Sequence, residues 1–264
     1  MKTTMVRPKK HLGQHFLHDR SIAGRIAALA SDQASLVLEV GPGTGVLTQF
    51  LLPRFGERLK LVEIDGESVD YLHQHFALSK DQLIHGDFLA VPVERYGSDN
   101  VIVIGNFPYN ISSQIFFHIL ASRHLVREIV CMIQLEVAQR IAAPPGSKTY
   151  GILSVLLQAW YNISLELEVG PGAFNPPPKV KSAVLRLTRN AVEHLNCDEN
   201  LFQTVVKQAF NQRRKTLRNA LGSLISRDTT HSLLEKRAEQ LGVQDFVQLT
   251  SWIEQLMKTS AINS

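Results

Sequence analysis

LVLEVGPGTG, residues 36–45, is the stretch of sequence that decides the fold. Residues 36–40 are apolar except for Glu39 and include two valines, which is typical of a strand covered on both faces. Glycine-rich residues 41–45 follow, and glycines at a strand-to-helix turn let the backbone approach a bound molecule. The N–H groups of the next helix then point at that molecule. The stretch therefore predicts a strand, a turn and a helix with a ligand at the turn.

Short apolar segments rich in β-branched residues recur downstream, at residues 59–64, 82–85, 101–104 and 129–133. Helical patterns separate several of them, at residues 46–55, 67–78 and 111–121. Strands that alternate with helices predict a doubly wound, mostly parallel sheet, so the expected fold class is α/β and Rossmann-like. Apolar and polar residues alternate more in two later segments, which we expect to form late antiparallel strands, at residues 165–169 and 182–187.

The composition changes near residues 188–200, a polar stretch that is typical of a linker. Everything after it has helical patterns and no strand pattern. We therefore predict an α/β domain at residues 1–190 and a small helical domain at residues 191–264.

Composition excludes several classes of protein. The 264 residues are 44% hydrophobic and 20% charged, which fits a folded chain with a substantial core, and the formal net charge is +4. Cys131 and Cys197 form no CxxC pair, which excludes a disulfide framework and a cysteine-based zinc site. No hydrophobic signal segment follows the basic N-terminus, and the apolar residues 152–160 are too few to span a bilayer. We expect a cytoplasmic protein without metal or membrane contact.

Two carboxylates stand where the next strands end. Glu63 closes the second predicted strand, where it can accept hydrogen bonds from ribose hydroxyls, and Asp87 follows the third, where it can accept from an adenine amine. Ligands of doubly wound sheets lie outside the carboxyl ends of the strands, so both side chains converge on the glycine turn. Asp65 and Asp70 are expected to be solvated. The pattern predicts an adenosyl cofactor and leaves a dinucleotide and S-adenosylmethionine open, although Val46 replaces the third glycine of the dinucleotide fingerprint.

The fourth predicted strand runs into Gly105-Asn106-Phe107-Pro108-Tyr109, which favours methyl transfer to an amine. An exocyclic adenine amine is a poor nucleophile because its lone pair is delocalised into the ring. The side-chain carbonyl of Asn106 and the backbone carbonyl of Pro108 can accept its protons and localise that pair. Tyr109 offers a face for stacking a flipped base, worth about 1–3 kcal/mol. No general base is required, because the methylated ammonium loses its proton to water.

With these motifs the chain resembles the ribosomal RNA adenine N6,N6-dimethyltransferases, in their small-subunit branch of dimethyladenosine transferases. The matching stretches cover nearly the whole chain in the family's order: HLGQHFLHD (11–19), LEVGPGTGVLT (38–48), VEID (62–65), GDF (86–88), NFPYNIS (106–112), FNPPPKVKSAVLRL (174–187) and FNQRRKTLRNAL (210–221). The resemblance implies S-adenosylmethionine as the cofactor. It also implies dimethylation of two adjacent adenosines in a hairpin near the 3′ end of small-subunit ribosomal RNA, with a role in subunit assembly.

The resemblance also implies roles for particular residues. The N-terminal segment closes over the cofactor, and the expected cofactor contacts are His15, Leu17, Gly41, Gly43, Glu63, Asp87 and Asn106. Tyr109 and Phe174 are expected to sandwich the target adenine. The sequence departs from the family pattern at Phe107, where leucine is commoner and which narrows the expected pocket, and at Lys181, where an acid is common.

Residues 201–227 contain six basic residues and no acidic one: Lys207, Arg213, Arg214, Lys215, Arg218 and Arg227. At helical spacing, Lys207, Arg214 and Arg218 fall on one stripe, and a stripe of one sign suits phosphates. We expect RNA contacts from Lys179, Lys207, Arg214, Lys215 and Arg218. Arg213 points toward the apolar face and is expected to form a structural ion pair.

The sequence therefore predicts a monomeric enzyme that acts on small-subunit ribosomal RNA within the immature small subunit. Three alternatives stay open at this point. They are a related methyltransferase of large-subunit RNA, an assembly factor that binds RNA without catalysis, and a nicotinamide-dependent dehydrogenase.

Overall fold

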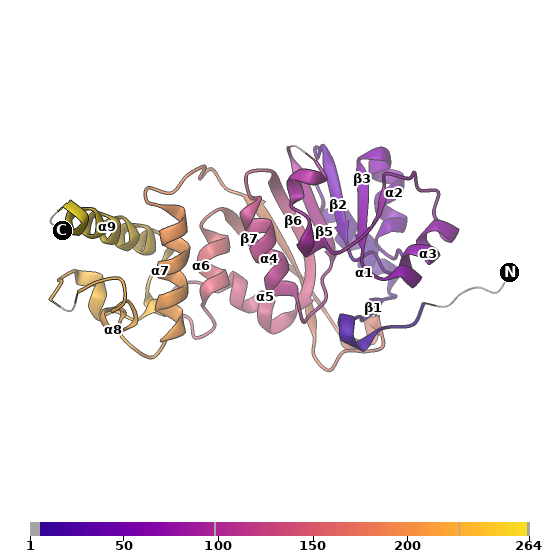
Figure 1. Cartoon of the computed structure of the whole chain (residues 1–264). Helices are drawn as coiled ribbons and strands as arrows, with labels where there is room; N and C mark the ends of the chain where they lie inside the picture. The colour runs from indigo at the N-terminus through magenta and orange to yellow at the C-terminus, as the bar shows by residue number, and fades with distance from the viewer. Residues whose placement is uncertain (1–5, 98, 227, 263–264) are drawn as a thin grey trace. The chain divides into compact units, whose positions relative to one another are not determined.

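The structure is a computed structural model, and it describes residues 6–97, 99–226 and 228–262 of the chain (Figure 1). Arg227, one of the basic residues noted above, lies outside the described residues. The chain divides into two compact units. The first comprises the described residues up to Ala138 together with Ile163–Arg189, and the second comprises Gln139–Asn162 and the described residues from Asn190 onward.

A seven-stranded sheet forms the centre of the first unit (Figure 1). Its spatial order is β4 (Leu83–His85), β3 (Leu59–Glu63), β2 (Leu36–Val40), β5 (Val101–Asn106), β6 (Val126–Gln134), β9 (Ser182–Arg189) and β7 (Tyr161–Val169). The first five of these strands pair in parallel, and β9 pairs with β6 antiparallel. The predicted α/β class is confirmed, and so is a late antiparallel strand. Because β2, β3 and β5 run in parallel, their carboxyl ends meet at one edge.

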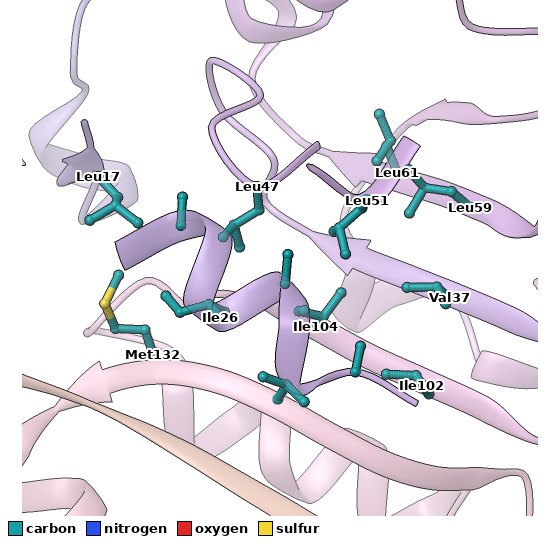
Figure 2. Packing of buried hydrophobic residues seen from close by; sticks show 14 of the residues in the cluster. Leu17, Ile26, Val37, Leu47, Leu51, Leu59, Leu61, Ile102, Ile104 and Met132 are labelled. Carbon is teal, nitrogen blue, oxygen red and sulfur yellow. The ribbon is translucent and has the colours of Figure 1, made fainter. Parts of the chain in front are cut away.

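The helices of this unit are α1 (Arg20–Leu29), α2 (Thr48–Phe55), α3 (Gly66–His75) and α4 (Ser112–Ala121), and α5 (Leu135–Ala142) begins in this unit and ends in the second. Asp19 begins α1 by accepting the Ile22 N–H at 3.0 Å, a standard N-cap. Each fully buried aliphatic side chain contributes about 1.5–3 kcal/mol. Figure 2 shows such side chains gathered between helix and strands, among them Ile26, Val37, Leu51, Leu61, Ile102 and Ile104.

Shorter elements complete this unit. A two-stranded antiparallel sheet of β1 (Phe16–Leu17) and β8 (Phe174–Asn175) ties the N-terminal segment to the chain that follows β7. It is too short for the sequence to predict. Single 3-10 turns lie at Lys10–Leu12, Gly56–Arg58, Phe88–Ala90, Val93–Arg95 and Pro171–Ala173.

The second unit is helical, with α6 (Ile152–Gln158), α7 (Glu199–Asn211), α8 (Leu217–Ala220) and α9 (Val243–Ile262), and with 3-10 turns at Ser232–Glu235 and Ala238–Gln240. It differs from the predicted domain at residues 191–264 because residues 139–162 join it. The apolar helix α6 packs against α7 and α9, and Trp160 meets Phe202 edge-on at 6.0 Å. The predicted boundary at residue 190 assigned α6 to the first domain, because α6 precedes that boundary in the sequence. No helix in the described ranges is long and apolar enough to cross a membrane.

Glu39 is a carboxyl buried inside the sheet. It lies in β2 with 1% of its surface exposed, and the Thr48 hydroxyl donates a hydrogen bond to its Oε2 at 2.8 Å. Burial raises the pKa of Glu39 to about 8, against the opposing Thr48 bond and with a further rise from the charge of Glu63. The group is therefore protonated in the folded protein at neutral pH.

The buried carboxyl predicts a pH-dependent stability. Between the ordinary pKa of 4.5 and about 8, the folded state holds a proton at Glu39 that the unfolded state has lost. Stability from this group therefore falls as pH rises through that window. Glu39→Gln removes the titration, so its melting temperature should rise relative to wild type as pH increases across the window. Calorimetry at a series of pH values measures this difference. A difference in melting temperature between the two proteins that does not change with pH would contradict the assignment.

Candidate active site

A cavity of about 300 Å³ lies where β2, β3 and β5 end, within the first unit. Four groups of residues line it: residues 11–16 of the N-terminal segment, the glycine turn after β2, the ends of β3 and β4, and residues 106–111 with the start of α4. The volume is at the lower end of the range for small-molecule sites. The sequence segments predicted to converge do so here.

The glycine turn forms one wall of the cavity. Gly41 and Gly43 both have left-handed backbones, with φ of 68° and 57°, which residues with a Cβ rarely adopt. At Gly43 a Cβ would also lie 2.8 Å from the Phe16 ring, whereas at Gly41 it would meet no protein atom within 4 Å. Gly43 thus admits the N-terminal segment, and the Cβ side of Gly41 leaves room for a ligand.

Glu63, the last residue of β3, is held beside that turn. Its Oε2 accepts the Gly43 N–H and its Oε1 accepts the Asp65 N–H, each at 2.9 Å. The side chain is 3% exposed, and burial raises its pKa although these backbone hydrogen bonds oppose the rise. Each carboxylate oxygen keeps a further lone pair, so Glu63 can accept from a ligand hydroxyl in the cavity.

Asp87 and Ile64 complete this side of the cavity. Asp87 caps a 3-10 turn by accepting the Leu89 N–H at 2.9 Å. Ile64 follows Glu63 and is 50% exposed at the cavity lining. Sequence reasoning missed Ile64, although an apolar residue beyond the end of a buried strand was a usable signal. Asp65, expected to be solvated, is instead 2% exposed and accepts hydrogen bonds from Lys9 and Ser68.

Asn106 closes β5, and its amide is oriented by the N-terminal segment. Its Nδ2 donates to the backbone carbonyl of His15 at 2.9 Å. A carbonyl can only accept, so the amide presents NH2 to His15 and keeps Oδ1 for another donor. His15 in turn donates from Nδ1 to the Pro176 carbonyl at 2.8 Å. Asn106 and His15 both line the cavity.

Pro108 and Tyr109 follow in the same loop. The Pro108 carbonyl accepts the Ile111 N–H at 3.2 Å, which leaves its second lone pair for a substrate. The Tyr109 hydroxyl hydrogen-bonds Ser182, and its ring stacks on the His15 ring with centroids 5.4 Å apart and planes inclined by 26°. Phe107 is fully buried at the cavity wall and packs edge-on against Phe116 at 5.9 Å.

Phe174 and Leu17 do not line the cavity. They face each other in the β1–β8 pair and are 3% and 2% exposed within the hydrophobic core. The expected sandwich of the base between Tyr109 and Phe174 is therefore not formed in this structure, where the ring against Tyr109 is that of His15. The two-residue pairing of β1 with β8 buries Phe174. The motif at residues 174–187 gives no sign of that pairing, so the sequence did not predict the burial.

The predicted RNA-binding residues of the second unit do not form one helical stripe. Helix α7 ends at Asn211, and a turn separates it from α8. Arg218 donates to Glu235 at 2.7 Å and to the Thr229 carbonyl at 2.8 Å, so its charge is balanced within the unit. The expected ion pair of Arg213 is formed with Glu239, at 3.8 Å.

Exposed basic side chains lie on both units. Arg214 and Lys215 are exposed in the turn after α7, as is Lys207 on α7 itself. Lys179 is exposed in the proline-rich loop of the first unit, and Lys181 beside it pairs with Glu168 at 3.5 Å. Over the part of the chain that the structure describes, no three histidine, cysteine or acidic side chains group as metal ligands.

Comparison with known proteins identifies the family. A family model described as ribosomal RNA adenine dimethylase matches residues 5–255. The chain belongs to this family. It is therefore an enzyme of the S-adenosylmethionine-dependent methyltransferase class. A ribosomal RNA small subunit methyltransferase A from Parabacteroides distasonis is 55% identical over 250 residues, which cover 93% of this chain and 94% of that protein. Its counterpart from Bacteroides thetaiotaomicron is 52% identical over 262 residues, with 97% of each chain covered.

Solved structures share the fold. A dimethyladenosine transferase from Plasmodium falciparum superposes with a TM-score of 0.74 at 23% identity, over 91% of this chain and 98% of that one. The 23S rRNA methyltransferase ErmE reaches a TM-score of 0.64 at 24% identity, over 89% and 99%. Both structures share the fold of this chain, and fold alone does not identify the RNA that an enzyme modifies.

Proposed function

We propose that this enzyme transfers methyl groups to the N6 amine of two adjacent adenosines in a hairpin near the 3′ end of small-subunit ribosomal RNA. The observation that carries the proposal is the orientation of Asn106, whose Oδ1 stays available at the cavity that Tyr109 also lines. The relatives named small subunit methyltransferase A support the choice of subunit. The substrate would be the immature small subunit. The enzyme would act in the cytoplasm and as a monomer.

The chain's residues suit S-adenosylmethionine. Glu63 would accept from the ribose hydroxyls and Asp87 from the adenine amine, while Gly41 leaves space for the ligand against the turn. Residues His15 and Phe16 of the N-terminal segment would cover the bound molecule from the other side. When bound, the cofactor supplies a methyl group on a positively charged sulfur. The acidic side chains of this wall complement that charge.

Asn106 and Pro108 would activate the nucleophile. Their carbonyl oxygens accept the two amine protons, which favours a pyramidal nitrogen with a localised lone pair. Tyr109 would hold the base by stacking, once its face is cleared of the His15 ring or the base enters between the two rings. Catalysis is then mainly positioning and electrostatics, and the product proton leaves to water.

Binding of the RNA would use the exposed cations. Arg214, Lys215 and Lys207 in the second unit and Lys179 in the first can each neutralise a phosphate. Arg218 would contribute less, because Glu235 already balances its charge.

Glu63→Ala tests the cofactor site. Losing a charged hydrogen-bond acceptor costs about 1.5–3 kcal/mol, so S-adenosylmethionine should bind about 10- to 100-fold more weakly. Isothermal calorimetry on the folded variant is the measurement. Asp70→Ala is the matched control, because it removes one exposed acidic charge from the neighbouring helix α3 and should leave affinity unchanged. Equal affinity of the two variants would remove Glu63 from the site.

Asn106→Ala tests the chemical step. Loss of one preorganised polar group should slow single-turnover methyl transfer by about 10²–10³-fold at saturating S-adenosylmethionine. Tyr109→Phe keeps the stacking face and should stay within about 10-fold of wild type, the effect of one lost hydrogen bond, whereas Tyr109→Ala should fall far below it. The substrate is unmethylated small subunits, with RNA binding measured separately. Normal turnover by Asn106→Ala would mean that another group activates the amine.

The double variant Arg214→Gln, Lys215→Gln tests the RNA surface. Fewer counterions are released when two phosphate contacts are lost, so the slope of log affinity against log salt should flatten by about 1.4 to 1.8. Filter binding to the ribosomal RNA hairpin over a salt series measures it, with Arg218→Gln as a comparison that should change the slope less. An unchanged slope in the double variant would place the phosphate contacts elsewhere.

A further inference from the structure

Tyr109 is held at two ends. Its backbone belongs to the loop that follows β5, and its hydroxyl hydrogen-bonds the hydroxyl of Ser182. Ser182 is the first residue of β9 and is fully buried, and none of the sequence motifs had singled it out for a role. The contact joins the loop that follows Asn106 to β9, and its two residues are 73 positions apart in the sequence.

The position of Ser182 is set by the sheet. It stands opposite Gln134 in the antiparallel pairing of β6 with β9. The adjoining Leu135 N–H donates to the Lys181 carbonyl at 3.0 Å, which continues the pairing beyond the strands. A side chain on such a ladder has little freedom to move, so Ser182 is a rigid anchor for whatever binds it.

The anchor restrains one degree of freedom of the Tyr109 ring. A phenol fixed at its Cβ and at its oxygen keeps the direction of its long axis. In this structure the His15 ring lies on one face of the Tyr109 ring, where a stacked base would take its place, so the restraint that persists with a base bound is the one at the hydroxyl. Burial raises the pKa of Tyr109, so the phenol keeps its proton at neutral pH and the hydroxyl pair persists.

We propose that Ser182 is a positioning residue for methyl transfer, which aligns the Tyr109 ring so that a base stacked on it presents its amine to Asn106. The inference rests on the proposed function of Tyr109 as the stacking platform. Stacking alone tolerates many angles, whereas attack on a methyl group requires a narrow one. A platform with a fixed axis therefore favours the chemical step more than it favours RNA binding.

A double-mutant cycle tests the proposal. Ser182→Ala, Tyr109→Phe and the double variant are compared in single-turnover methyl transfer to unmethylated small subunits, at saturating S-adenosylmethionine and saturating subunits. Each single change should slow the step by about 3- to 10-fold, the effect of one lost hydrogen bond, and the double variant should be no slower than either. Subunit affinity should change less than about 2-fold. Ser182→Thr, which keeps the hydroxyl, should restore most of the rate.

Ser122→Ala is the matched control. Ser122 is also a buried serine whose hydroxyl makes one side-chain hydrogen bond, to Glu94 at 3.0 Å, and it does not line the cavity. It should lower the melting temperature about as much as Ser182→Ala and leave the methyl-transfer rate unchanged. If Ser182 positions Tyr109, the two variants lose similar stability but only Ser182→Ala loses rate. If the Ser182 hydrogen bond is purely structural, the two variants have the same rate.

Two results would overturn the proposal. One is a wild-type rate for Ser182→Ala or, should that variant not fold, for Tyr109→Phe. The other is a double variant whose loss is the product of the two single losses, because the hydroxyls then act independently. Loss of activity in Tyr109→Ala together with either result would leave the stacking platform standing and remove only the role of Ser182. Full activity of Tyr109→Ala would remove the platform itself.

Discussion

The hydrogen bond from the Asn106 amide to the His15 carbonyl is the interaction on which the rest of the site depends. It sets which end of the amide faces the cavity, and it fastens the N-terminal segment to the end of β5. The segment is held elsewhere too, by Lys9 against Asp65 and Glu67 and by the β1–β8 pair. The cover of the cavity and the group that faces the substrate amine are therefore parts of one hydrogen-bonded arrangement.

Buried carboxyls give this arrangement its electrostatic character. Glu63 is held beside the glycine turn by two backbone N–H groups, and Glu39 lies inside the sheet in the strand that leads to the turn. Because burial keeps Glu39 protonated near neutral pH, the repulsion between the two groups is relieved there. Glu63 and Asp87 both line the cavity, and acidic side chains suit a cofactor with a positively charged sulfur.

The sequence was sufficient for the parts of the site that follow from strand order. Parallel strands end at one edge, so Glu63, Asp87 and Asn106 had to converge wherever their strands did. It was insufficient where contacts join distant segments. The burial of Phe174 depends on two-residue strands, and the basic residues after Asn211 depend on where α7 stops. The pairing of Asp65 with Lys9, and of Tyr109 with Ser182, likewise joins side chains that no local pattern connects.

Product analysis tests the central claim, that this cavity methylates adenine amines of the small subunit, most directly. The protein and labelled S-adenosylmethionine are incubated in three parallel reactions. One contains unmethylated small subunits, one contains naked ribosomal RNA of that subunit, and one contains large subunits. The RNA is then digested to nucleosides. Label is expected in N6,N6-dimethyladenosine from small-subunit RNA, with two such residues per particle, and none is expected from large subunits. Label confined to large subunits, or found in a nucleoside other than N6-methylated adenosine, would contradict it.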